Sequence, residues 1–293
     1  MCTLILGVGV AERGSVLLAA NRDEDPARPS DPPLLLRRSP PIAGGRDRLA
    51  GGTWLALRGR EAAVAMLNRR PAALEPPDHA RRSRGLLALD VAAVGETPRP
   101  ADPLPGHRLR EPVASPRAWD AGREPLAARA LARARAALAE ARVAPFSLVF
   151  ASPAACWVLG HDGRTEATVE EIGPGWHVLT HTRLDDPDEP RAAWLVGRLA
   201  GFAPRSRAEA EARVAELMSR HAGGGAPAVC IHAGGIVTVS SARVWLGAGG
   251  FRYVHAEGRP CAAPFDDYSH LLPAGAGQAV GPEHLRPAAG EDP

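Results

Sequence analysis

The chain has 293 residues, of which 45% are hydrophobic and 23% are charged, and this length and composition suit one large hydrophobic core. Every basic residue is arginine, the formal net charge is only +2, and aromatic residues make up 4% of the chain. Nucleic-acid binding would need a clustered basic stripe interleaved with aromatic side chains, so we expect no nucleic-acid partner.

The four cysteines, Cys2, Cys156, Cys230 and Cys261, are widely spaced and form no Cys-x-x-Cys pair. This spacing gives no zinc, thioredoxin-like or haem-attachment signature, so we predict no metal site. Cys156 and Cys230 lie in apolar runs and are interpreted as buried thiols. Such thiols are typical of a reducing compartment, and we expect a cytoplasmic protein. Charged residues at 12–13 interrupt the apolar start, so we expect neither a signal peptide nor a transmembrane segment.

The N-terminus carries the first candidate for chemistry. Methionine aminopeptidase accepts a small second residue, so we expect Met1 to be removed, which leaves a thiol and a free α-amine together on Cys2. An α-amine has a pKa of about 7.7–8.0 and a thiol a pKa of about 8.5, so the amine can act as general base for its own side chain. This arrangement is typical of an N-terminal nucleophile. A chance cysteine at the second position is the plain alternative.

Two apolar runs, residues 3–10 and 15–20, flank a turn and predict a β-hairpin. If Val10 pairs with Ser15, Asp23 lies directly opposite Cys2, where its carboxylate can hold the N-terminal ammonium. A shift of one residue would place Asp23 on the other face of the sheet. We therefore assign the cluster Asn21-Arg22-Asp23-Glu24 to the site, with a solvated run of charges as the alternative.

A second hairpin is predicted on either side of a turn at residues 58–61. If Leu57 pairs with Ala62, Asn68 lies opposite Gly51 at the strand end. Acyl transfer needs N–H groups aimed at the carbonyl oxygen, so Asn68 is a candidate oxyanion donor, and a plain turn residue is the alternative.

The rest of the chain alternates between helical and strand patterns. Helices are predicted after Ser83, from Pro125, near Pro190 and after Ser206. Strands are predicted at residues 147–150, 156–159, 167–172, 176–180, 229–232, 236–240, 243–246 and 251–255. Segments 25–41 and 96–116 are interpreted as surface loops, and residues 273–293 as a poorly ordered tail that follows a single domain of residues 1–272. This order suits an α+β fold in which two antiparallel sheets pack face to face with helices outside, a four-layer αββα sandwich.

Six motifs follow one another over the first 85 residues: Met1-Cys2-Thr3-Leu4-Ile5, Asn21-Arg22-Asp23-Glu24, Gly44-Gly45-Arg46-Asp47, Ala50-Gly51-Gly52-Thr53-Trp54-Leu55, Leu67-Asn68-Arg69 and Ser83-Arg84-Gly85. In this order they resemble the motifs of the NRDE family, which is the transport and Golgi organisation protein 2 family. Weaker similarity continues to about residue 270. The resemblance implies an N-terminal nucleophile hydrolase-like fold, a likeness to cysteine-type acylases that begin Met-Cys-Thr, and roles in haem or lipid handling.

The resemblance also implies roles for individual residues. We expect Cys2 to be the nucleophile, Asp23 to orient its amine, and Asn68 with His181 to stabilise the oxyanion. Similar acylases carry an asparagine where this chain has His181, whose ring nitrogen can donate instead. The expected substrate-binding residues are Asn21, Arg22, Gly51, Gly52, Trp54 and Arg69. His177 and His181 lie about 13 Å apart on an extended strand, so we expect them not to share a metal ion.

Two functions remain open at this point. The first is a cysteine amidohydrolase that acts on a non-peptide or acyl C–N bond. The second is a non-catalytic carrier or chaperone of haem or an acyl lipid with the same fold. No resident cofactor is expected, and the expected partner is a small acyl compound or haem. Carried haem would be held weakly by Cys2, His177, His181 or His232, with Arg22 or Arg69 at its propionates.

Overall fold

The computed structural model describes residues 2–69, 81–95, 109–110, 124–164 and 167–274. The helices in these residues are α1 (Arg84–Ala92), α2 (Pro125–Glu140), α3 (Pro190–Leu199), α4 (Arg207–Met218) and the short 3-10 helix η1 (Ser269–Leu271). The strands are β1 (Thr3–Val8), β2 (Val16–Glu24), β3 (Ser30–Arg38), β4 (Pro41–Asp47), β5 (Leu55–Arg58), β6 (Ala62–Asn68), β7 (Leu109–Arg110), β8 (Phe146–Ala151), β9 (Cys156–His161), β10 (Ala167–Glu171), β11 (Gly175–Leu179), β12 (Val237–Gly247), β13 (Gly250–Ala256) and β14 (Asp266–Asp267).

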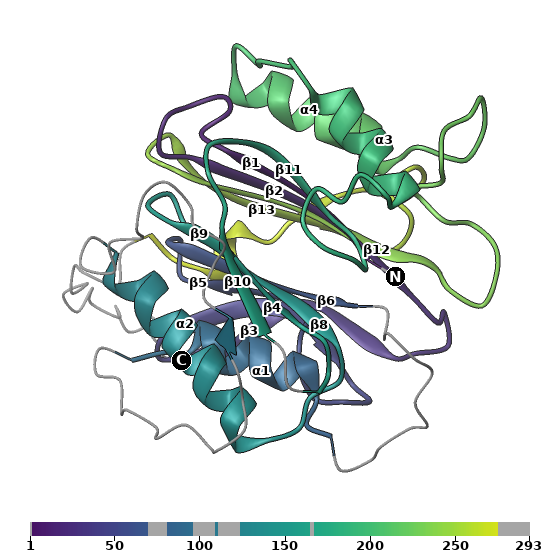
Figure 1. Cartoon of the computed structure of the whole chain (residues 1–293). Helices are drawn as coiled ribbons and strands as arrows, with labels where there is room; N and C mark the ends of the chain where they lie inside the picture. Colours follow the sequence, from purple (N-terminus) through teal and green to yellow (C-terminus); the bar gives the residue numbers. More distant parts are fainter. Residues whose placement is uncertain (1, 70–80, 96–108, 111–123, 165–166, 275–293) are drawn as a thin grey trace, which may run out of the picture.

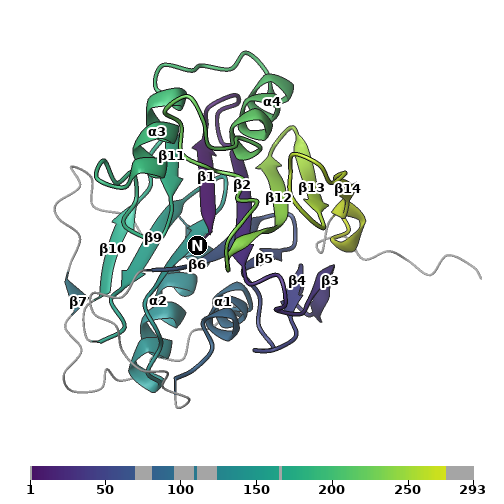
Figure 2. The ribbon, with the colours of Figure 1, turned by 90° about the vertical axis from the view of Figure 1, so that its right-hand side faces the viewer.

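The strands form two sheets that lie between two pairs of helices (Figure 1). The first sheet has the order β11-β1-β2-β12-β13-β14, and the second has the order β3-β4-β5-β6-β8-β9-β10-β7. Figure 2 shows α3 and α4 above the first sheet and α1 and α2 below the second. All pairings are antiparallel except the short parallel pair β7–β10. The predicted αββα sandwich is therefore confirmed.

Three hydrophobic clusters hold the four layers together. The first lies between the second sheet and helices α1 and α2, and the second lies between the two sheets. The third joins the first sheet to α3 and α4. Strand β1 shows how a sequence can serve two clusters at once, because side chains alternate between the faces of a strand. Leu4 and Leu6 enter the core between the sheets, whereas Ile5 enters the core under the helices.

Several segments differ from the sequence prediction. Residues 25–41, predicted as a surface loop, contain most of the β3–β4 hairpin. Residues 229–232 form no strand, and the two strands predicted at 236–246 are one long strand, β12, with a bulge between Thr238 and Ser240. Residues 275–293 of the predicted tail, and the predicted loop at 96–116 apart from residues 109–110, lie outside the described residues. None of the described helices is long and apolar enough to span a membrane.

Both predicted hairpin registers are wrong by one position. In the first hairpin Val8 pairs with Val16 and Thr3 with Asn21, so the continued register sets Arg22, not Asp23, opposite Cys2. The turn closes where the Gly9 N–H donates to the Ser15 carbonyl over 2.8 Å, and Gly9 takes a left-handed φ of 63° that favours glycine.

In the second hairpin Arg58, rather than Leu57, pairs with Ala62. The loop is shorter than predicted because Gly59 adopts a positive φ of 50°. Continuation of this register sets Asn68 opposite Gly52, one position from the predicted Gly51.

The glycine motifs are explained by close packing of backbone segments. A Cβ atom on Gly52 would overlap the backbone of Gly85, at the start of α1, and the Thr53 N–H donates to the Gly85 carbonyl over 3.2 Å. A Cβ atom on Gly45 would overlap the ring of Trp54. These glycines therefore bring the β4–β5 connection against α1 and beneath an aromatic side chain.

We predict that Gly52→Ala lowers the free energy of unfolding by about 1–3 kcal/mol, because the new methyl group must displace backbone. Urea unfolding measures the change. The matched control is Gly197→Ala, at an exposed position of α3 where a Cβ atom would have open space, and it should be neutral or stabilise by about 0.5–1 kcal/mol. Equal stability of both variants would contradict the packing described for Gly52.

Candidate active site

Cys2 lies in the wall of a pocket of about 700 Å³ at one end of the sandwich. The wall is built from Cys2 just before β1, the end of β2, the end of β4 with the β4–β5 connection, the end of β6 and the segment that enters α1. Its lining residues are Cys2, Arg22, Glu24, Arg28, Asp47, Leu49, Ala50, Thr53, Trp54, Met66, Asn68, Arg81, Arg82, Ser83, Arg84, Gly85 and Ala144. Residues from all six sequence motifs therefore meet around one cavity.

The four residues of the Asn21-Arg22-Asp23-Glu24 motif point alternately to the two faces of β2. Arg22 and Glu24 line the pocket. On the opposite face, Asp23 contacts Arg191 of α3 and Asn21 bonds to the end of α4. The one-residue register shift thus puts the Asp23 side chain on the face away from the pocket.

The thiol of Cys2 is protonated at neutral pH in this environment. Burial raises its pKa, and the negative charge of Asp23 raises it further, although a hydrogen bond from the Asp23 backbone N–H favours the thiolate. The positive charge of Arg22 also lowers the pKa of Cys2, by less than that hydrogen bond does. Cys2 consequently needs a base before it can attack an acyl carbon.

Asp23 is held by two side chains from other parts of the fold. The Thr238 hydroxyl donates to Oδ1 over 2.7 Å, and Nη1 of Arg191 donates to Oδ2 over 3.1 Å. The same Arg191 nitrogen donates to the Thr3 hydroxyl over 2.8 Å. Burial raises the pKa of Asp23, and its bonds to Thr238 and Arg191 oppose that effect. The carboxylate is thus fixed in place beside the first residues of β1.

Arg22 connects two of the glycine-rich motifs. Its guanidinium lies over the Trp54 ring, 4.2 Å from the centroid, and the Trp54 ring occupies the space left by Gly45. Asp47 on the same wall accepts from Nη2 of Arg28 over 2.7 Å. Arg22 and Trp54, which the sequence predicted to bind substrate, line the pocket together with Cys2.

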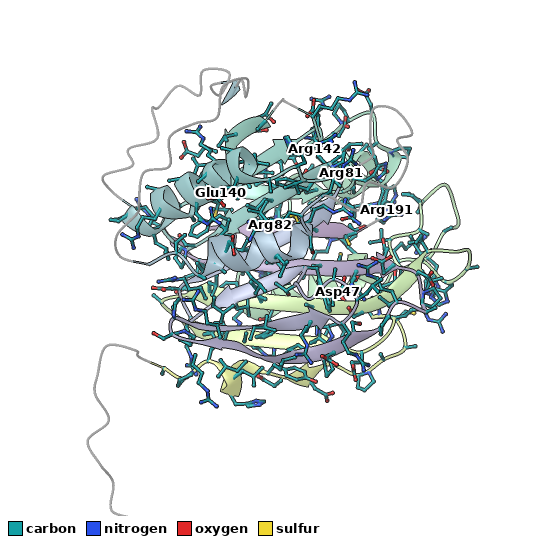
Figure 3. All side chains as sticks on the ribbon, turned by 90° about the horizontal axis from the view of Figure 1, so that it is seen from below. Asp47, Arg81, Arg82, Glu140, Arg142 and Arg191 are labelled. Carbon is teal, nitrogen blue, oxygen red and sulfur yellow. The ribbon has the colours of Figure 1, made fainter. Side chains whose placement is uncertain are left out.

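The pocket wall carries more positive than negative charge. Five of its lining residues are arginines and two are acidic. Figure 3 labels three of them, Asp47, Arg81 and Arg82. Arg82 is paired with Asp90 over 2.6 Å, and Arg84 donates to the Pro145 carbonyl over 3.0 Å. Burial lowers the pKa of Arg84, and the negative charges of Cys2 and Glu24 oppose that effect. Arg84 lines the same pocket as Cys2.

The two predicted oxyanion donors differ in their positions. Asn68 is exposed at the end of β6 and lines the pocket together with Cys2. His181 is 8% exposed and is not among the lining residues. Leu4 pairs with Leu179 in the β1–β11 ladder, and continuation of this register by two positions sets His181 opposite Cys2.

The remaining predicted binding residues, Asn21, Gly51, Gly52 and Arg69, are not among those that line the pocket. The Asn21 amide nitrogen donates to the carbonyls of Met218 and Val229 over 2.9 and 3.0 Å. Gly51 and Gly52 shape the loop under Trp54. The Arg69 guanidinium lies against Gly160 of β9, whose missing side chain leaves it room. Asn21, Gly51 and Gly52 therefore have structural roles in this fold.

A second group of reactive side chains was missed by the sequence prediction. Potential metal-ligand atoms of His221, Cys230, His232 and Cys261 all lie within 4.8 Å of one another. The prediction of no metal site rested on sequence spacing, and these residues come from two separate connections, one after α4 and one after β13. The Cys230-x-His232 pair was the one local signal.

The model of the family described as Transport and Golgi organisation 2 matches residues 1–194. The chain belongs to this family. Among curated proteins compared by sequence, none matches significantly. Membership of the Transport and Golgi organisation 2 family confirms the resemblance that the six sequence motifs carried.

Solved structures of similar fold include acylases and amidases. The Caenorhabditis elegans ortholog of N-acylethanolamine-hydrolyzing acid amidase has a TM-score of 0.50 at 13% identity, over 83% of this chain and 92% of that chain. Penicillin V acylase from Agrobacterium tumefaciens has a TM-score of 0.47 at 13% identity, over 92% of this chain and 86% of that chain. The mutant C2A of conjugated bile acid hydrolase from Clostridium perfringens has a TM-score of 0.42 at 11% identity, over 92% of this chain and 96% of that chain. The first match confirms the N-terminal nucleophile hydrolase-like fold.

We predict that Asn21→Ala lowers the free energy of unfolding by about 1–3 kcal/mol, because it leaves two buried carbonyls without their donor. The matched control is Asn68→Ala, an exposed asparagine that should change stability by no more than about 0.5 kcal/mol. Urea unfolding of both variants measures the difference. An Asn21→Ala protein of unchanged stability would contradict the structural role.

Proposed function

We propose that this protein is a cysteine amidohydrolase that cleaves an acyl C–N bond of a small molecule bearing an anionic group. The observation that carries the proposal is the position of Cys2, which lies at the N-terminus and lines a pocket rich in arginine. The likeness to an N-acylethanolamine-hydrolyzing amidase supports the same class of reaction.

Removal of Met1 would supply the base that Cys2 needs. The free α-amine, with a pKa of about 8, accepts the thiol proton, and Sγ attacks the acyl carbon. Asp23 would act on the amine from the other face of β2. Its charge already raises the pKa of the Cys2 thiol, so the carboxylate is near enough to stabilise the ammonium that forms.

The oxyanion of the tetrahedral intermediate would accept from the Asn68 side chain, which shares the pocket with Cys2. His181 would be the second donor. The α-ammonium then returns its proton to the departing amine as the C–N bond breaks, which leaves an acyl thioester on Cys2. Water, deprotonated by the same α-amine, hydrolyses this thioester and regenerates the thiol.

The charge of the pocket points to the substrate class. Arginine forms strong charge-assisted bonds with carboxylate and phosphate groups. Arg22 and Arg84 both line the pocket with Cys2, and Arg22 already lies over the Trp54 ring, so Arg84 would meet an anionic group of the substrate. An N-acyl amino acid has both features, an acyl C–N bond and a carboxylate one carbon away.

A carrier of haem or an acyl lipid is the second candidate function, because the same pocket offers a thiol beside arginines. Of the iron ligands predicted from the sequence, Cys2 lines this pocket. His177 Nδ1 is 2.7 Å from Asp185 Oδ2 and its Nε2 is 3.0 Å from the Gly173 carbonyl. His232 belongs to the separate cysteine and histidine group. Carried haem would therefore bind through Cys2, with Arg22 or Arg84 at a propionate.

We predict that Met1 is absent from the mature protein and that Cys2→Ala abolishes release of amine from N-acyl amino acids. Intact mass spectrometry and an amine assay on a panel of acyl chain lengths test both statements. Asp23→Asn should weaken turnover without abolishing it, because the amine loses its charged partner. The carrier would be favoured by a different pair of results. The native protein would shift the haem Soret band and turn over no N-acyl substrate, and the Cys2→Ala protein would no longer shift the band.

We predict that Arg84→Gln raises KM for an N-acyl amino acid about tenfold or more, since a charge-assisted bond contributes about 1.5–3 kcal/mol. Glutamine keeps a donor for the Pro145 carbonyl. An uncharged N-acyl amide with the same acyl chain serves as the matched substrate, and its KM should change little. Equal increases for both substrates would show that the substitution disturbs the pocket rather than anion binding.

A further inference from the structure

Four side chains with metal-binding atoms converge at the surface beyond the end of α4. His221, Cys230 and His232 lie in the connection between α4 and β12, and Cys261 lies in the connection that follows β13. Their ligand atoms are all within 4.8 Å of one another. Among the described residues, this group is the one in which at least three such side chains meet at that spacing.

The distances in this group match those of a tetrahedral zinc site. Bonds of about 2.3 Å to sulfur and 2.0–2.1 Å to nitrogen, in tetrahedral geometry, separate two sulfurs by about 3.8 Å and a sulfur from a nitrogen by about 3.6 Å. The two Sγ atoms of Cys230 and Cys261 are 3.6 Å apart. Nε2 of His232 lies 3.5 Å from Sγ of Cys230 and 3.2 Å from Sγ of Cys261.

We propose that His221, Cys230, His232 and Cys261 bind one zinc ion in a closed tetrahedral site. Two thiolates and two imidazoles form a donor set typical of structural zinc sites, and softness and tetrahedral geometry favour zinc over calcium or magnesium. His221 supplies the fourth vertex, since its ring centroid is 4.3 Å from that of His232. Four protein ligands leave no open coordination position, so the ion is structural rather than catalytic.

A disulfide is the competing arrangement of the two cysteines. The separation of 3.6 Å between their sulfurs is well above the bond length of about 2.05 Å. A disulfide would also give no reason for His221 and His232 to lie beside the two cysteines. The metal accounts for all four side chains together.

Arg259 sets one condition for metal binding. Its Nη1 lies 3.4 Å from Nδ1 of His232, an exposed contact in which the guanidinium donates. When Nε2 binds zinc, Nδ1 carries the ring proton and can no longer accept. The Arg259 side chain must then turn outward, which its exposed position permits.

The zinc ion would stabilise the segment that holds Asp23. Next to Cys230, the Ile231 N–H donates to the Thr238 hydroxyl over 2.9 Å, and that hydroxyl donates to Asp23. On the other side, the Val229 carbonyl accepts from Asn21 over 3.0 Å. The metal would therefore join the connections that follow α4 and β13 behind the Asn21-Arg22-Asp23-Glu24 motif. This role does not depend on the reaction proposed for the pocket.

Metal content tests the site. The full chain, produced without a histidine tag, is equilibrated with zinc, dialysed and measured by inductively coupled plasma mass spectrometry. We expect one zinc per chain in the native protein and in two controls, Cys156→Ser and His270→Gln, which change the same residue types away from the cluster. Cys230→Ser and Cys261→Ser should each lose most of the zinc. Native protein that keeps no more zinc than these two variants would overturn the proposal.

Cobalt substitution tests the geometry in the native protein, so it does not depend on whether a variant folds. One equivalent of Co²⁺ should give a thiolate charge-transfer band and intense visible bands typical of tetrahedral coordination, and zinc should displace both. The melting temperature should fall on treatment with a chelator and recover with zinc. A featureless cobalt spectrum, or a Cys230–Cys261 disulfide in protein alkylated at lysis, would overturn the site.

Discussion

The alternation of side chains along β2 is the constraint on which the site depends. Because β2 is a central strand with helices on one face and the second sheet on the other, consecutive residues must serve different surroundings. Arg22 and Glu24 face the pocket, whereas Asn21 and Asp23 face the helices. The motif therefore does two things at once: it lines the pocket beside Cys2 and anchors the elements that pack behind it.

Much of the fold could be predicted from the sequence because its patterns are strong and local. The continuous apolar runs of β1 and β2, divided by a turn, and the Ala-Leu-Arg pattern of α2 specify their structures without distant information. Cys2, Arg22, Trp54 and Asn68 could be assigned to one site because their motifs follow one another in the order of a known family, and the structure brings them to one pocket.

The parts that could not be predicted depend on a single backbone angle or on distant contacts. Gly9 and Gly59 set the hairpin registers through positive φ values of 63° and 50°, and a shift of one residue exchanges the faces. Asn21 resembles a binding residue in the sequence, but its partners are carbonyls at positions 218 and 229. Cys261 and Cys230 are separated in the sequence by β12 and β13, and the folding of these strands brings the two side chains together, so no sequence spacing could reveal the cluster.

We propose that Cys2 reacts because its own α-amine takes the proton that a buried thiol otherwise keeps. An acyl-transferring probe, applied to processed protein and to protein that retains Met1, tests this claim directly by intact mass and peptide mapping. The account predicts one acyl group, on Cys2, in the processed form, and little in the form whose amine lies one residue away. Equal acylation of Cys2 in both forms, or acylation mainly at another cysteine, would contradict it.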